Sequence, residues 1–220
     1  MIKRIFRMIC GGMLAGVVMS VSVFGSPLPE QEVNERRLTV HLEEVFSAKV
    51  SLTPFEGKKA IKPIDEVSDV KTGEIAVIKI PAQYLPGEFV LRLDYSTKEG
   101  DNPYPAERIV YINNQDIELS VNPPYINSDK TKFSKGETEN TVYTAFMKEN
   151  STKRMPLDLL RQFLLSYDRP ESSFYTQGVE EFEQRRVEYN AWLSDQAKTY
   201  HELYVSSLFQ FQYISAMEWI

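Results

Sequence analysis

A chain of 220 residues, of which 42% are hydrophobic and 25% charged, has enough apolar material for a packed core and is not typical of a disordered protein. Its formal net charge is −6, and residues 26–220 carry 22 Lys and Arg against 31 Asp and Glu, because the first 25 residues hold three cations and no acid. An acidic chain repels phosphate backbones and anionic lipid head groups, which excludes nucleic acid as a favoured partner.

Residues 1–25 have the pattern of a secretory signal peptide: a basic start is followed by an uncharged stretch over residues 8–24. This stretch lies at the lower edge of the length that spans a bilayer, so membrane contact is expected only through an uncleaved segment. We therefore predict an exported protein of the periplasm or cell envelope. Cys10, the single cysteine, lies in the removed segment, which leaves the mature chain without a disulfide.

Residues 26–36 form a predicted linker, and residues 37–125 alternate apolar and polar side chains as β-strands do. The expected strands are, in chain order, 38–42, 46–52, 75–80, 89–95, 108–112 and 117–121. Turn-forming segments rich in Pro, Gly, Asn and Asp separate them, with no helical pattern in between. This order predicts an antiparallel β-sandwich or small barrel.

Residues 126–136 form a predicted connector, after which apolar residues recur at helical spacing through residues 137–220. The spacing predicts one short helix around 142–147, a second behind Pro156, and a longer helix from about Gly178 that Ser194-Asp195 could divide. The fold class is therefore α+β, a sandwich followed by an α-helical segment. Because short amphipathic helices are marginal alone, the two parts are expected to share one core or one large interface.

The carboxy-terminal segment 203–217 contains no charged residue, and we expect it to be helical. One broad apolar face suits the chain's own core. A second stripe, formed by Val205, Phe209 and Tyr213 at every fourth position, predicts a docking surface for a protein partner or a second copy of the chain. In that case Phe209→Asp together with Tyr213→Asp should yield a folded monomer. The alternative is a central helix that this chain buries all round.

The residue inventory predicts no catalytic, cofactor-binding or metal site. The mature chain lacks a thiol, and its two histidines, His41 and His201, fall in a strand pattern and a helix pattern with no third histidine to join them. No Gly-x-Ser-x-Gly or phosphate-loop motif is present. Carboxylate pairs such as a glycosidase needs occur at 43–44, 65–66 and 180–181, although solvated faces explain them better.

Four tyrosines fall near expected strand ends, where an aromatic platform for a glycan or a peptide could form. They are Tyr95, Tyr104, Tyr111 and Tyr125. Tyrosine is also a common strand and core residue, so a purely structural role is the alternative.

Several segments follow one another in order after the predicted signal peptide. They are Leu85-Pro86-Gly87-Glu88-Phe89-Val90-Leu91, Ile109-Val110-Tyr111-Ile112-Asn113-Asn114, the short strand 117–121, Lys135-Gly136-Glu137-Thr138-Glu139-Asn140 before Tyr143 and Phe146, and Phe174-Tyr175 between helices. In this order, the run from Leu38 to Tyr213 resembles the amino-terminal half of envelope-located, thioredoxin-like thiol-disulfide oxidoreductases of Bacteroidetes-type bacteria.

In that family a carboxy-terminal thioredoxin fold with a Cys-x-x-Cys pair performs the redox reaction, and nothing in this chain matches that pair. The resemblance therefore implies a non-catalytic front module without a cofactor. Its partner would be the redox domain that is absent from this chain, or a second copy of itself. The rival interpretations are a stand-alone envelope module that binds a glycan or a peptide and, less favoured, a hydrolase that uses a carboxylate pair.

Overall fold

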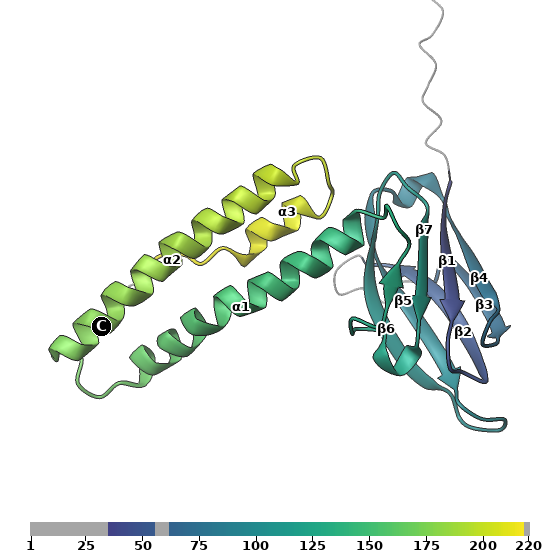
Figure 1. Cartoon of the computed structure of the whole chain (residues 1–220), viewed down its shortest axis with the longest axis horizontal. Helices are drawn as coiled ribbons and strands as arrows, with labels where there is room; N and C mark the ends of the chain where they lie inside the picture. The colour runs from purple at the N-terminus through teal and green to yellow at the C-terminus, as the bar shows by residue number, and fades with distance from the viewer. Residues whose placement is uncertain (1–34, 56–61, 218–220) are drawn as a thin grey trace, which may run out of the picture. The chain divides into compact units, whose positions relative to one another are not determined.

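A computed structural model describes residues 35–55 and 62–217. The predicted signal peptide, Cys10 and most of the predicted linker lie outside the described residues. Strands come first along the described chain and helices follow (Figure 1). The predicted α+β class, a β-sandwich followed by an α-helical segment, is confirmed.

The β-part consists of two four-stranded sheets, ordered β4-β1-β7-β8 and β3-β2-β5-β6, that pack on each other and are not closed into a barrel. The strands are β1 (Arg36–Leu42), β2 (Ser47–Pro54), β3 (Asp65–Val70), β4 (Ile75–Ile80), β5 (Gly87–Ser96), β6 (Tyr104–Ile112), β7 (Ile117–Val121) and β8 (Lys132–Phe133), with 3-10 turns η1 (Ala82–Tyr84) and η2 (Pro123–Tyr125). Neighbouring strands are antiparallel, except that β1 and β7 are parallel.

Alternation of side chains explains the core between the two sheets. In β4, Ala76, Ile78 and Ile80 are fully buried, whereas Ile75 and Val77 point outward and are exposed. Buried side chains from both sheets form one apolar cluster in this way. Burial of a side chain of the size of isoleucine stabilises the fold by roughly 1.5–3 kcal/mol. The alternating pattern therefore decides which face of each strand points inward.

Two strands were not expected from the sequence. β3 lies at the edge of its sheet, and most of its side chains are polar and at least partly exposed, so it lacks the alternation that marks the other strands. β8 pairs with β7 and extends the sandwich to Phe133. The predicted end of the sandwich at residue 125, and the assignment of 126–136 as a bare connector, are therefore wrong.

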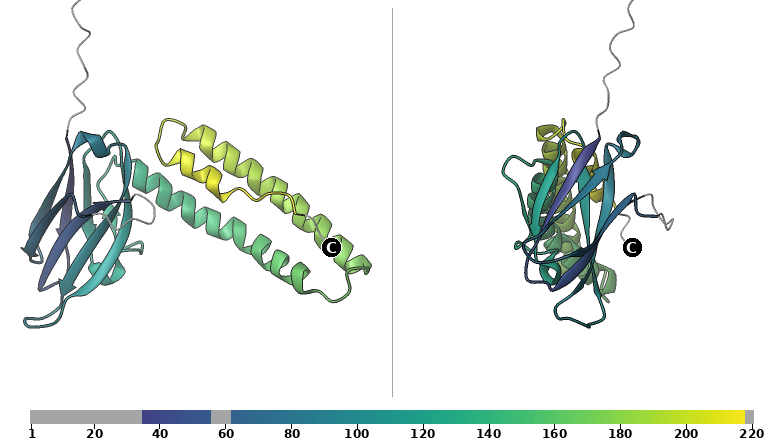
Figure 2. Two further views of the ribbon diagram at one scale, coloured as in Figure 1. Left: turned by 180° about the vertical axis from the view of Figure 1, so that it is seen from behind. Right: turned by 90° about the vertical axis from the view of Figure 1, so that its right-hand side faces the viewer.

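The helices are α1 (Glu139–Ser166), α2 (Ser173–Thr199) and α3 (Ser206–Phe209). α1 and α2 run antiparallel, and α3 packs against α2 (Figures 1 and 2). The prediction of two short helices before α2 is wrong, because α1 is one helix of 28 residues that continues through Pro156. A proline inside a helix costs about 3 kcal/mol. The helix continues because Phe146 and Leu157, on either side of the proline, are buried in the same core.

α2 begins before the predicted start at Gly178 and passes Ser194-Asp195 without a break. The hydroxyl of Ser172 accepts a hydrogen bond from the Tyr175 N–H at 3.1 Å and caps the helix. Gly178 instead permits close packing, since a Cβ at this position would lie 2.9 Å from Cδ2 of Leu164 on α1.

The predicted helix over 203–217 is also wrong. α3 is followed by a 3-10 turn, η3 (Gln210–Gln212), and residues 213–217 have no regular secondary structure. Asn190 of α2 holds this segment by donating to the Ile214 carbonyl at 2.8 Å and accepting from the Ile214 N–H at 3.1 Å. Within residues 35–55 and 62–217, no helix combines the length and the apolar character that a bilayer span requires.

The helices enclose a second buried apolar cluster, so the described residues form two clusters rather than one shared core. Its members are Tyr111, Phe146, Leu157, Leu164, Tyr175, Phe182, Tyr189, Leu193, Val205 and Phe209. Tyr111 belongs to β6, and thus the sandwich contributes a buried side chain to the helical core.

Candidate functional site

Buried polar side chains at the start of α1 connect the helices to the sandwich. Glu139 is only 1% exposed. Its carboxylate accepts hydrogen bonds from the N–H groups of Tyr204 and Val205, each at 3.0 Å, and from Nδ2 of Asn113 at 2.9 Å. The segment after α2, the first turn of α1 and the turn after β6 therefore meet at one carboxylate.

Asn140 makes a second connection at the same junction. Its Oδ1 accepts from the Tyr111 N–H and its Nδ2 donates to the Tyr111 carbonyl, both at 2.8 Å. Glu137 caps the helix, since its carboxylate accepts from the N–H groups of Asn140 at 2.8 Å and Thr141 at 2.9 Å. The polar segment that opens α1 thus has its carboxylates and amides paired, which favours a structural role over catalysis.

Tyrosines surround this junction. Tyr111 and Tyr143 contact each other with ring centroids 4.5 Å apart. Burial raises the pKa of Tyr111, and the neighbouring Tyr143 raises it further. Burial also raises the pKa of Tyr204 and of Glu88, the cross-strand neighbour of Tyr111. Tyr111 and Tyr204 therefore stay protonated at neutral pH and do not supply a phenolate base.

The four tyrosines predicted as an aromatic platform do not lie together. Tyr95 and Tyr104 are cross-strand neighbours with ring centroids 6.1 Å apart. Tyr111 lies seven residues further along β6, about 23 Å from Tyr104 at the usual rise per strand residue, and is buried. Tyr125 is exposed, with the Lys130 ammonium 3.6 Å from its ring centroid. The four-residue platform is therefore wrong, and the structure keeps one pair.

The predicted docking stripe is also divided. Val205 and Phe209 are fully buried, whereas Tyr213 is 58% exposed. The Phe209 ring stacks on Phe146 at a centroid distance of 3.8 Å. The stripe breaks because α3 ends at Phe209 and the 3-10 turn that follows changes the spacing of the side chains. The prediction of one exposed docking stripe is therefore wrong. The alternative, burial by this chain, is correct for Val205 and Phe209.

Exposed apolar side chains gather on the hairpin of α1 and α2 instead. Met155, Leu159 and Phe163 recur every fourth residue on α1 and are 58%, 59% and 40% exposed. The Phe163 ring contacts the ring of Phe174, on α2, edge to face at 5.8 Å, and Phe174 is 58% exposed. We call these four residues the apolar row.

A groove of about 450 Å³ adjoins the apolar row where the two helices come close at Gly178. Its lining residues are Leu160, Phe163, Phe174, Gln177, Gly178 and Glu181. None of the four residues of the apolar row was predicted from the sequence to form an exposed site. The four-residue spacing from Met155 to Phe163 was the signal that could have identified the row.

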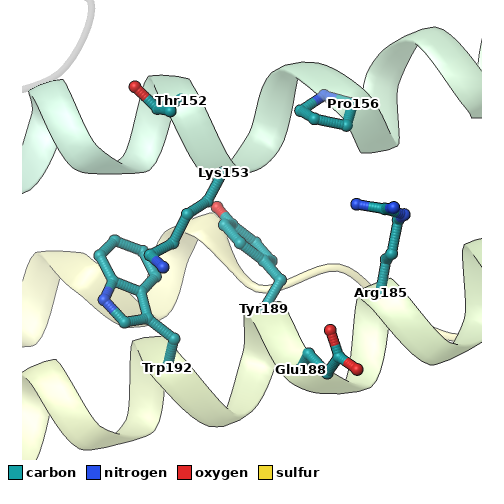
Figure 3. A pocket seen from close by; sticks show the side chains of 7 residues that line it. All are labelled: Thr152, Lys153, Pro156, Arg185, Glu188, Tyr189 and Trp192. Atoms are coloured by element: carbon teal, nitrogen blue, oxygen red, sulfur yellow. The ribbon is translucent and has the colours of Figure 1, made fainter.

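A second groove, of about 280 Å³, lies between the middle parts of α1 and α2 (Figure 3). Figure 3 shows the Lys153 side chain reaching from α1 toward Trp192 on α2, and its ammonium lies 5.3 Å from the indole centroid. Tyr189 donates its hydroxyl proton to Asn150 Oδ1 at 2.6 Å, and Arg185 pairs with Glu181. The polar groups of this groove are thus engaged within the hairpin, which favours a packing role.

The remaining candidates for chemistry are separated or paired. His41 bonds Glu118 at 2.6 Å on the outer face of the first sheet, and His201 lies in the turn after α2, hydrogen-bonded to the Lys198 carbonyl. In the carboxylate pair 65–66, Glu66 pairs with Lys49. No group of three His, Cys, Asp or Glu side chains that could hold a metal ion occurs in the described part of the chain.

Comparisons with known proteins add little to this geometry. No protein-family model matches the chain, and no curated protein sequence matches it. Among solved structures, the crystal structure of (S)-allantoin synthase is similar over 48% of this chain and 45% of its own chain, at 12% identity and a TM-score of 0.30. At that TM-score the similarity carries no argument about fold or activity.

Proposed function

We propose that this chain is the non-catalytic docking module of an exported, thioredoxin-like thiol-disulfide oxidoreductase whose redox domain is absent from the chain. The observation that carries the proposal is the apolar row. Its four large side chains are each at least 40% exposed. An exposed apolar patch on a soluble protein usually marks an interface.

The order of segments that resembles this family supports the choice of partner. The segment that opens α1 holds the helical hairpin on the sandwich through Glu139 and Asn140. The hairpin therefore serves as a support that presents the apolar row. A thioredoxin-like domain that docks on the row would cover Phe163 and Phe174 and leave its own Cys-x-x-Cys pair free to react with substrates.

Photo-crosslinking in the native host tests the partner. Benzoylphenylalanine replaces Leu159, in the middle of the apolar row, or Lys98, an exposed residue of the sandwich, as the control. We expect the probe at residue 159 to join the chain to a protein that carries a thioredoxin fold with Cys-x-x-Cys, as identified by mass spectrometry, and the probe at residue 98 not to do so. Crosslinks from residue 159 that reach only proteins without this motif would contradict the proposal.

The chain itself is expected to have no redox activity. Cys10 is its single cysteine, and a mature chain that begins at Ser26 has no attacking sulfur. Addition of purified residues 26–220 should leave the rate of insulin reduction by dithiothreitol unchanged, as followed by turbidity. Acceleration of the reaction above the rate with an equal mass of albumin would show a redox function in this chain.

A further inference from the structure

One edge of the sandwich has an unoccupied backbone position. β6 is the edge strand of the sheet β3-β2-β5-β6. Asn127 donates its side-chain N–H to the Glu107 carbonyl at 2.9 Å, and Asn140 bonds both the N–H and the carbonyl of Tyr111. Backbone groups alternate in direction along an antiparallel strand, so those of Ile109, midway between Glu107 and Tyr111, also point away from β5.

The two asparagines therefore stand where a neighbouring strand would lie, and they leave one gap between them. In the described residues, the hydrogen bonds along this edge reach Glu107 and Tyr111 but not the N–H or the carbonyl of Ile109. An unpaired N–H and carbonyl on a strand edge are the groups that an added extended peptide binds.

Ile109 lines a cleft of about 500 Å³ between β6, the loop after η2 and α1. The other lining residues are Arg108, Asn127, Asp129, Tyr143, Thr144, Met147 and Lys148. Tyr143 and Met147 supply apolar walls. Asp129 and Lys148 join the two sides through an ion pair at 3.7 Å, and both side chains are largely exposed, so this contact is weak and can open.

Arg108 supplies positive charge to the cleft. Its guanidinium donates to the Ile126 carbonyl at 2.7 Å and to the Thr144 hydroxyl at 3.2 Å, which leaves further N–H groups of its five for another acceptor. Burial lowers the pKa of Arg108, and the negative charge of Glu137 opposes that shift. A carboxylate brought into the cleft would further stabilise the charged guanidinium.

We propose that this cleft binds an extended peptide segment of a partner protein, in which an apolar residue pairs with Ile109 and its neighbour in sequence carries a carboxylate. Side chains alternate along a strand, so a residue opposite Ile109 lies on the face where Tyr111 contacts Tyr143, and the next residue lies on the face of Arg108. The flanking asparagines restrict pairing to one residue. The site is separate from the apolar row and does not depend on the proposed function.

Fluorescence anisotropy of residues 26–220 tests the site with a fluorescein-labelled peptide of alternating Glu and Val. Met147→Glu places a negative charge in the cleft and is expected to weaken binding by about tenfold or more. Leu165→Glu is the matched control, since Leu165 lies on the same helix outside both the cleft and the apolar row and is also exposed. It should leave the affinity within about twofold. The same peptide with Lys in place of Glu should bind about tenfold more weakly.

Amide hydrogen exchange measured by NMR reads the backbone pairing directly. The Ile109 N–H is expected to exchange more slowly when the Glu-Val peptide is bound, because the added strand accepts its proton. The proposal is overturned if the peptide does not bind at about 1 mM, or if Leu165→Glu weakens binding as much as Met147→Glu. Unchanged exchange at Ile109 with the peptide bound, or equal binding of the Lys peptide, would also overturn it.

Discussion

Glu139→Ala is expected to lower the free energy of unfolding by about 3–5 kcal/mol. The substitution removes a buried carboxylate that accepts three hydrogen bonds, from the N–H groups of Tyr204 and Val205 and from the Asn113 amide. Those donors would then be left without a partner in a place that water reaches poorly, since Glu139 is 1% exposed. The cost of an unsatisfied buried donor exceeds the net gain of an ordinary hydrogen bond.

Urea unfolding followed by far-ultraviolet circular dichroism measures this effect. Glu149→Ala is the matched control, because Glu149 lies on the same helix, is about half exposed and makes one surface ion pair with Lys153. It should change the free energy by less than about 0.5 kcal/mol. Glu139→Gln, which keeps one acceptor oxygen, should fall between the two. Equal stability of the Glu139→Ala and Glu149→Ala variants would show that the junction does not hold the helices.

Phe209→Ala is expected to cost about 3–5 kcal/mol, the range typical of removing a buried phenylalanine. Phe209 is fully buried and packs on Phe146 and Tyr200, so its loss leaves a cavity between α3 and the hairpin. Tyr213→Ala, which truncates an exposed side chain, should change the free energy by less than about 0.5 kcal/mol. The two residues were grouped in one stripe from the sequence, and these variants separate them.

Chemical denaturation of the two variants side by side gives the comparison. The same reasoning reverses the expectation for Phe209→Asp together with Tyr213→Asp, because a carboxylate in the helical core has no partner there. That double variant should unfold the helical part rather than yield a folded monomer. If Phe209→Ala and Tyr213→Ala proved equally mild, Phe209 would be a surface residue and the packing of α3 described above would be incorrect.

The strands of the sandwich were predictable wherever one face of the strand is buried and the other is exposed to solvent. β4 is the clearest case, since its buried and exposed side chains alternate without a break and the sequence repeats with the same period. β3 escaped detection because an edge strand with polar residues such as Asp65 and Glu66 carries no such alternation. Its pairing with β2, through Val50 and Val67 among others, depends on residues that are distant in sequence.

The helices show the same division between local and long-range causes. Helical spacing correctly predicted helices in the segments that form α1 and α2, but local propensity indicated a helix boundary at Pro156. That boundary is overridden by burial on both sides of the proline, which requires α2 to be in place. Spacing also could not distinguish the buried Val205 and Phe209 from the exposed Tyr213. It contains no information about where a helix ends or which of its turns other segments cover.

No periodic pattern in the sequence predicts the contacts at the junction of sandwich and helices. Glu139 and Asn140 resemble ordinary polar residues of a first helical turn, and their partners Tyr111 and Val205 lie 29 and 66 residues away. Hydrophobic periodicity records which side of an element avoids water, and this is a local property. Which buried polar groups find each other, which edge positions such as Ile109 stay open, and which apolar side chains remain uncovered depend on the packing of distant segments, where hydrogen-bond geometry and excluded water act together.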